Sequence, residues 1–391
     1  MKILQINNFP RLGGAEVLFQ NSIELLERYG NQVVSFSSRI NEKNIVTDYS
    51  IEKSKSLVSR AYSIEAKKKI EQIILLEKPD IAHFHNIIGS ITFSILPVLK
   101  RNKIPIVATI HDYKLLCPTS NFYNARKNEL CEKCKGGKFY NCVVDRCSTK
   151  GLLNSILLSS EGYFRNIFFP FHKIIDEFIF VSDFELKKFL EVYPYLISKS
   201  NLIYNFTNRF SYSENKGNYF LSFGRLAVEK GLLTLLETFR RLPSATLKIV
   251  GEGELKEVIS NNKTHNVELI GFKFGKELEQ IIKDAYFTIV PSECYETNSL
   301  TTVESYSFGK PVIGTNLGAL SELIINGITG FTFKRKNIDE LAEIINTCLR
   351  MGNEQYFHYS KNAFKFANEK FSPDVHYTQL MEVYNKALLK N

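Results

Sequence analysis

Four charged residues in the second half of the chain have the types and spacing needed to hold a phosphorylated sugar. Arg225 and Lys230 follow one apolar run, and Glu296 and Glu304 follow another. Each run is typical of a buried parallel strand, so these charges should lie at strand carboxyl ends, where open α/β sheets bind ligands. A guanidinium and an ammonium suit a diphosphate, and carboxylates accept hydrogen bonds from sugar and ribose hydroxyls. The pattern therefore predicts a site for a nucleotide sugar.

The residues after Glu296 should supply further polar groups to this site. Asn298, Ser299 and Leu300 open a predicted helix. Their backbone N–H groups would point outward at the helix N-terminus and could bind sugar hydroxyls or phosphate. Glu304 follows Glu296 by about two helical turns.

Candidate residues of the first half also follow strands. Gly13 and Gly14 precede a helix, and without a Cβ atom their N–H groups can approach phosphate oxygens. His111 follows one apolar strand and His85 ends another. A lone histidine commonly has a structural role, and for His85 contact with a substrate and packing under a loop stay open.

The elements that must position these residues alternate along the chain as in α/β proteins. Helical patterns such as Glu16–Tyr29 and Glu65–Glu77 separate the strands, and the polar segment Asn205 to Asn218 predicts a linker. The predicted strands are Lys2–Ile6, Val33–Phe36, Ile81–Phe84, Ile106–Ile110, Phe178–Val181, Tyr219–Phe223, Thr246–Val250, Val267–Ile270, Tyr286–Val290, Pro311–Ile313 and Gly330–Phe333.

Length and composition limit the classes of protein that fit. The 391 residues exceed the size of one ordinary core and favour two domains. No apolar run reaches the length of a membrane-spanning helix, and the first residues resemble a strand rather than a signal peptide, so we expect a cytoplasmic protein. The absence of nucleic-acid-binding motifs argues against a nucleic-acid partner.

Six stretches, in order along nearly the whole chain, resemble the retaining GT-B glycosyltransferases of family 4, of the bacterial polysaccharide type. They are Gly13-Gly14-Ala15-Glu16, Thr109-Ile110-His111-Asp112, the Arg225/Lys230 segment, Gly251-Glu252-Gly253, Pro291-Ser292 leading into Glu296 and Glu304, and Gly327-Ile328-Thr329-Gly330-Phe331. The resemblance implies two Rossmann-like domains facing each other across a cleft. We expect an acceptor-side domain over 1–204, a nucleotide-sugar domain over 205–373 and a helix over 374–391 that returns to the first domain.

The resemblance also implies roles for the candidate residues. It makes His111, Arg225, Lys230 and Glu296 catalytic, and the acceptor-side role falls to His85. The donor-binding residues are then Gly13, Gly14, Asn298, Ser299, Leu300 and Glu304. Family enzymes use no protein nucleophile, because the acceptor hydroxyl attacks from the face that the diphosphate leaves and a diphosphate oxygen takes its proton. They require no metal, because fixed cations and helix N-termini stabilise the charge of the leaving group. Thr297 and Asn298 stand where many relatives have glycine and an aromatic residue, which leaves the identity of the sugar open.

A cysteine-rich insertion over 117–147 follows His111 and should border the acceptor opening. Cys131, Cys134, Cys142 and Cys147 offer four thiolates, beginning with a Cys-x-x-Cys pair. In a reducing compartment such a set favours a structural zinc site, with free thiols or a redox or iron–sulfur role as alternatives.

The charge and the apolar content of the first half suggest that it binds a membrane surface. Residues 1–200 contain 28 Lys+Arg and 20 Asp+Glu, so they carry eight of the nine net positive charges. An anionic leaflet, an anionic substrate and a solvated basic surface all fit this excess. The apolar stretch 151–171 fits a buried core helix, a helix at a membrane, or a groove for a lipid-linked acceptor.

The sequence thus predicts a transferase that moves a sugar from a nucleotide diphosphate sugar to a carbohydrate or lipid-linked acceptor in surface glycan assembly. It would act at the inner face of the plasma membrane. A non-catalytic nucleotide-sugar-binding relative is the alternative. A dehydrogenase is disfavoured because no Gly-x-Gly-x-x-Gly motif follows the first strand. The donor base, sugar, acceptor and linkage are not specified by these residues.

Overall fold

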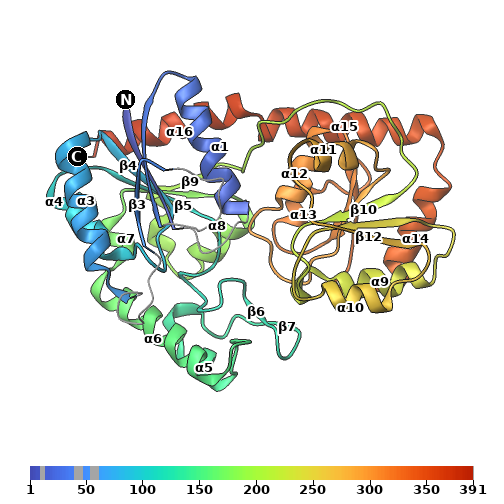
Figure 1. The fold of residues 1–391 in the computed structure, drawn as a ribbon, viewed down its shortest axis with the longest axis horizontal. Coiled ribbons are helices and arrows are strands. Elements are labelled where there is room, and N and C mark those ends of the chain that lie inside the picture. Colours follow the sequence, from blue (N-terminus) through green and yellow to red (C-terminus); the bar gives the residue numbers. More distant parts are fainter. Residues whose placement is uncertain (9–13, 39–46, 53–60, 391) are drawn as a thin grey trace. The chain divides into compact units, whose positions relative to one another are not determined.

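The computed structural model describes residues 1–8, 14–38, 47–52 and 61–390 and divides the chain into two compact units. The first unit contains residues 1–120, 132–205 and 373–391, and the second contains 121–131 and 206–372. Each unit is built on its own parallel sheet (Figure 1).

The first unit contains a seven-stranded sheet in the order β3-β2-β1-β4-β5-β8-β9. All of its strand pairs are parallel. The strands are β1 (Lys2–Asn7), β2 (Gln32–Ser38), β3 (Tyr49–Ile51), β4 (Ile81–Asn86), β5 (Ile106–Ile110), β8 (Glu177–Phe180) and β9 (Ser200–Leu202). The sequence predicted five of them but not β3 and β9, which are edge strands of three residues.

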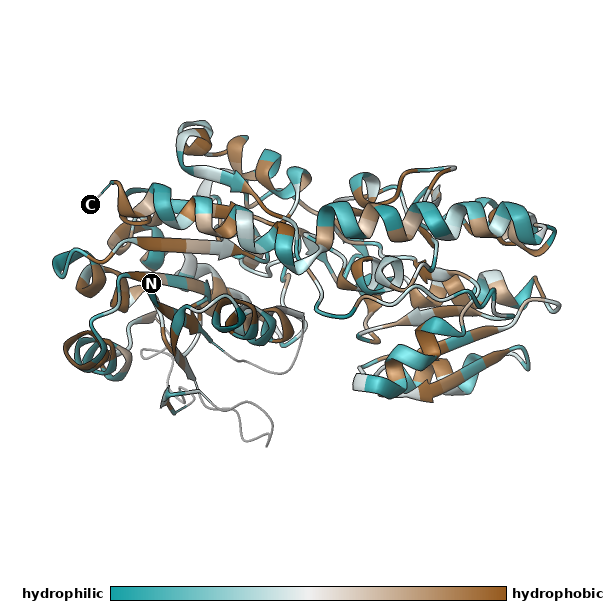
Figure 2. Cartoon of the chain, turned by 90° about the horizontal axis from the view of Figure 1, so that it is seen from above, coloured by the Kyte–Doolittle hydropathy of each residue, from teal (hydrophilic) through white to brown (hydrophobic). Residues whose placement is uncertain are grey.

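Helices connect the strands of this sheet. They are α1 (Gly14–Arg28), α3 (Ile64–Glu77), α4 (Leu96–Arg101), α5 (Tyr140–Val144), α6 (Leu152–Phe168), α7 (Phe171–Ile174) and α8 (Asp183–Leu190), with short 3-10 turns η1 (Phe93–Ile95), η2 (Lys135–Gly137) and η3 (Pro194–Lys199). Figure 2 shows that the strands are largely hydrophobic, whereas the helices mix hydrophobic and hydrophilic residues. This is the pattern of strands buried on both faces by amphipathic helices.

The last helix, α16 (Pro373–Leu388), belongs to the first unit, as the sequence predicted. Its buried residues Leu380, Val383, Tyr384 and Ala387 follow the spacing of one helix face. They form one core cluster with side chains of β1, β4, β5 and β8, including Ile3, Ile81, Val107 and Ile179. The last helix therefore packs into the same core as the first strand.

The second unit has a six-stranded parallel sheet in the order β12-β11-β10-β13-β14-β15. Its strands are β10 (Phe220–Phe223), β11 (Leu247–Val250), β12 (Val267–Gly271), β13 (Thr288–Val290), β14 (Val312–Thr315) and β15 (Gly330–Phe333). The sequence predicted all six, with end shifts of up to two residues.

The helices of the second unit alternate with these strands. They are α9 (Leu232–Arg240), α10 (Lys256–Asn262), α11 (Gly275–Lys283), α12 (Leu300–Ser307), α13 (Leu320–Leu323), α14 (Ile338–Leu349) and α15 (Asn353–Phe371), with the 3-10 turn η4 (Val228–Lys230). Their apolar faces and the strands form one core that includes Phe220, Leu235, Ile249, Ile289 and Ile345.

Part of the cysteine-rich insertion departs from its predicted place. We expected the whole insertion in the first domain, but the hairpin of β6 (Tyr123–Asn124) and β7 (Glu129–Leu130) groups with the second unit. Within that unit, Arg335 and Lys336 donate hydrogen bonds of 2.9 and 2.7 Å to the carbonyl of Asn128. Contacts between residues more than 200 positions apart, which local pattern does not reveal, decide this placement.

Candidate active site

Three loops of the second unit meet at the carboxyl ends of its strands. Gly231 has a φ of +70°, and a Cβ atom there would lie 1.9 Å from the carbonyl oxygen of Pro291. A Cβ atom on Gly251 would lie 1.9 Å from the carbonyl oxygen of Gly224. Only glycine permits these close backbone approaches, which bring the loops after β10, β11 and β13 together. Three of the four charged residues that the sequence singled out lie on these loops.

Lys230 and Glu296 form the central ion pair of this site. The Nζ atom of Lys230 lies 2.6 Å from Oε1 of Glu296, and the Ser292 hydroxyl donates to the same oxygen. Burial alone would lower the pKa of Lys230, but the neighbouring carboxylate raises this pKa above its usual value. Burial opposes charge on Glu296, whereas Lys230 and Ser292 bring its pKa below the usual value. Both groups therefore stay charged at neutral pH.

Arg225 lies on the same loop and forms an ion pair with Glu229. The Arg225 side chain is 43% exposed, whereas that of Glu229 is only 10% exposed. A buried carboxylate thus orients a guanidinium that remains open to solvent, which suits the recognition of an anionic group.

Glu304 lies on α12 and has a different environment from Glu296. Its side chain makes no hydrogen bond or ion pair with any residue that the structure describes. Burial raises the pKa of Glu304 from 4.5 to about 7, partly opposed by the charge of Arg209. A carboxyl group with unused acceptor capacity can receive hydrogen bonds from ligand hydroxyls.

The N-terminus of α12 lies directly after Glu296 in the chain, as predicted. Ser299 is the N-cap, and its hydroxyl accepts a hydrogen bond from the Thr302 amide at 3.3 Å. Ser299 therefore stabilises the helix through its side chain, which leaves its backbone amide as the group able to reach a ligand. Leu300 is the first helical residue, and Asn298 precedes the cap.

In the first unit, His85 and His111 form a hydrogen-bonded chain with Gln5. His85 Nδ1 lies 2.9 Å from His111 Nε2, and His85 Nε2 lies 3.0 Å from Gln5 Oε1. An amide oxygen only accepts, so Nε2 of His85 must donate and Nδ1 of His85 must accept. His111 therefore donates through Nε2, and its Nδ1 is an acceptor. Both ring nitrogens of His85 are engaged within the unit, so His85 orients His111, and its contact with an acceptor stays a prediction.

Burial keeps these histidines neutral. It lowers the pKa of His111 to about 4, and it lowers the pKa of His85 well below its usual value. A second chain supports them, because His83 lies 2.8 Å from the Tyr384 hydroxyl and 2.7 Å from that of Thr109. Gln5 and Tyr384 were not singled out from the sequence, although Gln5 is a polar residue inside an otherwise apolar strand. A polar residue at such a position could have pointed to the hydrogen-bonded side chains around His85.

The two glycines of the first half are only partly located. Gly13 lies outside the described residues, and Gly14 is the exposed first residue of α1. Their expected phosphate contact stays a prediction.

The cysteines do not form the expected zinc site. Cys134, Cys142 and Cys147 are buried around Phe139, whereas Cys131 is partly exposed. Over the described part of the chain, which includes all four cysteines, no group of three or more His, Cys, Asp and Glu side chains is arranged to hold a metal ion. The three buried thiols pack against an aromatic ring as small apolar groups do. The structure thus gives no support to a zinc site, and the assignment of zinc ligands stays a prediction.

Two protein-family models match the chain. The model of Glycosyltransferase Family 4 matches residues 12–209, about half of the chain, and that of Glycosyl transferases group 1 matches residues 205–366. The chain belongs to Glycosyltransferase Family 4, and it is therefore a glycosyltransferase of the retaining, metal-independent type.

Known proteins agree with this assignment. The chain is 26% identical over 355 residues to an uncharacterized glycosyltransferase, MJ1178, of Methanocaldococcus jannaschii, covering 88% of this chain and 87% of that one. It is 27% identical over 143 residues to a lipopolysaccharide 1,2-N-acetylglucosaminetransferase of Salmonella typhimurium, covering 32% and 38%. Anabaena Alr3699/HepE in complex with UDP-glucose has a similar fold, with a TM-score of 0.68, 17% identity and coverage of 98% and 99%. The predicted GT-B fold is confirmed.

None of the helices in the described ranges has the length and apolar character needed to cross a membrane.

Proposed function

We propose that this enzyme transfers a sugar from a nucleotide diphosphate sugar to a carbohydrate acceptor carried on a lipid, in the assembly of a surface glycan. The observation that carries the donor assignment is the Lys230–Glu296 pair, 2.6 Å apart at the carboxyl ends of the strands. A fixed ammonium next to a fixed carboxylate offers one group to a phosphate and one to sugar hydroxyls.

Each residue of the donor half has a distinct proposed role. Lys230 and Arg225 bind the diphosphate and stabilise its charge as the glycosidic bond to the sugar breaks. Glu296 accepts hydrogen bonds from sugar hydroxyls, and Glu304 accepts them from ribose. The amides of Asn298, Ser299 and Leu300 add dipoles that favour the anionic donor.

The transfer itself needs no protein nucleophile. The acceptor hydroxyl attacks the anomeric carbon from the face that the diphosphate leaves, and a phosphate oxygen takes the hydroxyl proton. One glycosidic bond forms as the other breaks, so the configuration is retained. His111, held neutral and oriented by His85, contacts the donor sugar. The protein contributes mainly positioning and electrostatic stabilisation.

UDP-sugars are the first donors to test, because the HepE structures contain UDP, glucose or UDP-glucose. Thermal-shift measurements with UDP-, GDP-, ADP- and dTDP-sugars would identify the donor, since a ligand that binds only the folded state raises the melting temperature. We expect one base to give a shift that Lys230→Ala abolishes. If no nucleotide sugar stabilises the wild type at millimolar concentration, the donor assignment is wrong.

The acceptor class follows from relatives and from surface chemistry. One relative is named as a lipopolysaccharide transferase. The basic first half of the chain suits a location at the inner face of the plasma membrane. Transfer of radiolabelled sugar into lipid extracts, compared with free oligosaccharides, tests this class. Label found only in water-soluble products would contradict it.

A further inference from the structure

Helix α6 turns its small and polar residues toward the interior of the first unit. Its buried residues are Ser155, Ser159, Gly162 and Arg165. A Cβ atom on Gly162 would lie 2.8 Å from the ring of Phe139, so the helix packs closely at this point. The face that an ordinary amphipathic helix fills with large apolar side chains is therefore occupied here by small ones.

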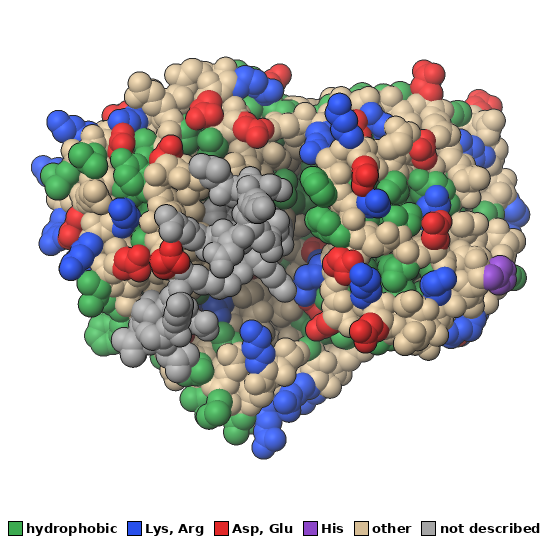
Figure 3. All heavy atoms as spheres, viewed as in Figure 1, with side chains coloured by type: hydrophobic (Ala, Val, Ile, Leu, Met, Phe, Trp, Pro, Cys, Tyr) green, Lys and Arg blue, Asp and Glu red, His purple; other side chains and the backbone are tan. Residues whose placement is uncertain are grey.

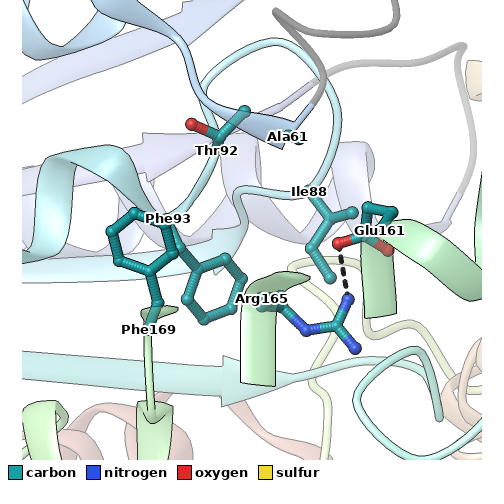
Figure 4. A pocket seen from close by; sticks show the side chains of 7 residues that line it. All are labelled: Ala61, Ile88, Thr92, Phe93, Glu161, Arg165 and Phe169. Carbon is teal, nitrogen blue, oxygen red and sulfur yellow. Dashed lines mark hydrogen bonds and ion pairs between the residues drawn. The ribbon is translucent and has the colours of Figure 1, made fainter. Parts of the chain in front are cut away.

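Arg165 lies on the inner side of α6 and makes polar contacts there. Figure 4 shows Arg165 and Glu161 at a small pocket beside Phe93 and Phe169. Arg165 is 3% exposed, pairs with Glu161 at 2.7 Å and donates to the Lys114 carbonyl at 3.2 Å. These contacts fix the rotation of the helix about its own axis.

Six large apolar side chains of α6 consequently face solvent, whereas three others are half-buried. Leu153 is 78% exposed, Ile167 is 69% exposed and Phe168 is 63% exposed. On α5, Tyr140 and Val144 are 55% and 73% exposed. The members of this set, which we call the α5–α6 apolar face, are Tyr140, Val144, Leu152, Leu153, Ile156, Tyr163, Ile167 and Phe168. Of the three alternatives for residues 151–171, a helix buried in the core through its large apolar side chains does not fit α6, although Phe169 and Phe171 after the helix are buried.

Cations flank the α5–α6 apolar face. Lys138, Arg146 and Lys150 are exposed and form no ion pair with any residue in the described ranges. By contrast, Lys133 is paired with Asp145 at 2.8 Å. Figure 3 shows hydrophobic side chains next to Lys and Arg side chains at the lower edge of the molecule, over α5 and α6.

We propose that the α5–α6 apolar face docks onto an anionic lipid leaflet. Its apolar side chains would enter the boundary between headgroups and acyl chains, and the three unpaired cations would contact lipid phosphates. A second copy of the chain fits less well, since a twofold contact through this face would bring the same cations together. The proposal deepens the proposed function, because it names the surface that brings the enzyme to a lipid-linked acceptor.

Vesicle binding tests the surface without donor or acceptor. The full chain should cosediment with phosphatidylglycerol-containing vesicles at low salt, bind phosphatidylcholine vesicles far less, and dissociate at about half-molar salt. Leu153→Ser with Ile167→Ser should lower the partition coefficient at least about tenfold, as expected when two apolar side chains no longer enter the bilayer. Lys138→Gln with Arg146→Gln should lower it by a similar factor.

A matched control uses exposed leucines elsewhere in the same unit. Leu75 and Leu76 on α3 are 76% and 63% exposed, so Leu75→Ser with Leu76→Ser removes comparable apolar area from another helix. This variant should bind as the wild type does. Melting temperatures within a few degrees of the wild type would show that all variants are folded.

The chain contains no tryptophan, which allows a direct probe of insertion. In Ile167→Trp the emission should shift to shorter wavelength when anionic vesicles are added, whereas Leu76→Trp should not respond. The proposal is overturned if the wild type ignores anionic vesicles at low salt, or if the Leu153/Ile167 variant binds unchanged. It is also overturned if sedimentation experiments show that the face mediates a dimer and the protein does not bind vesicles. Unchanged transfer by these variants to a water-soluble acceptor would separate this outcome from failure of the transferase assignment.

Discussion

Lys230 and Arg225 are each held by a carboxylate, but the two carboxylates have different consequences. Glu296 pairs with Lys230 and is itself a candidate ligand for sugar hydroxyls, whereas Glu229 is buried and only orients Arg225. The difference predicts that the two cations contribute through charge and that Glu229 contributes through position.

Arg225→Ala and Lys230→Ala should each lower kcat/KM by about 10² to 10³, the scale observed when one preorganised charge-stabilising donor is lost. The measurement is steady-state transfer with the identified donor. Glu229→Gln serves as the comparison and should cost about tenfold or less, because it weakens the orientation of Arg225 without removing its charge. Full activity of either alanine variant at every donor concentration would show that the diphosphate is bound elsewhere.

Glu304 should make stability depend on pH. With its pKa raised from 4.5 to about 7, the folded protein keeps a proton that the unfolded chain has lost in this window. Folding stability should therefore fall as the pH rises from about 5 to 8. Glu304→Gln removes this contribution, so its melting temperature should gain a few degrees on the wild type across the same range. A difference that stays constant with pH would contradict the raised pKa.

At the scale of elements, α6 depends on close approach through its small residues. Gly162→Ala would ordinarily stabilise a helix, by about 1 kcal/mol. Here the added methyl group would meet Phe139 at 2.8 Å, and we expect a net loss of about 1–3 kcal/mol in unfolding free energy. Denaturant titration measures it. Ser160→Ala on the exposed side of α6 should instead be neutral or slightly stabilising, and Phe139→Leu should reduce the penalty of Gly162→Ala.

Helix α5 and the β6–β7 hairpin belong to one cysteine-rich insertion but to different units. Buried thiols around Phe139 stabilise the first of these, and hydrogen bonds from Arg335 and Lys336 hold the second. The insertion is therefore built from two elements that need separate mutational tests.

At the scale of the molecule, both ends of the chain build the first unit. The Tyr384 hydroxyl of α16 lies 3.1 Å from Gln5 Nε2 and 2.8 Å from His83 Nδ1. The last helix therefore supports the hydrogen-bonded side chains that orient His111. Tyr384→Phe leaves two buried polar groups with fewer partners.

We expect Tyr384→Phe to cost about 1–3 kcal/mol, and Leu380→Ala to cost about 2–4 kcal/mol through a cavity in the core. Calorimetry should show both losses in the transition of the first unit. Leu389→Ala is the control, since that side chain is 87% exposed and should leave the transition unchanged. If Leu380→Ala has no effect, α16 does not complete this core.

The sequence by itself determined most strands, the two α/β units and the positions of the catalytic candidates. Buried parallel strands read as short apolar runs, and a residue directly after such a run must lie at the ligand-binding edge of its sheet. For this reason Arg225, Lys230, Glu296 and His111 could be selected without coordinates.

Only the tertiary structure decided which groups meet. Lys230 and Glu296, which form an ion pair, are 66 positions apart in the sequence, and Gln5 and Tyr384, which form a hydrogen bond, are 379 positions apart. The sequence also did not predict which side of α6 faces solvent. Apolar residues occur around much of this helix, so their pattern alone does not say which side packs against the rest of the unit. A helix buries the side that fits most closely against its neighbours, and that fit exists only once the neighbours are in place.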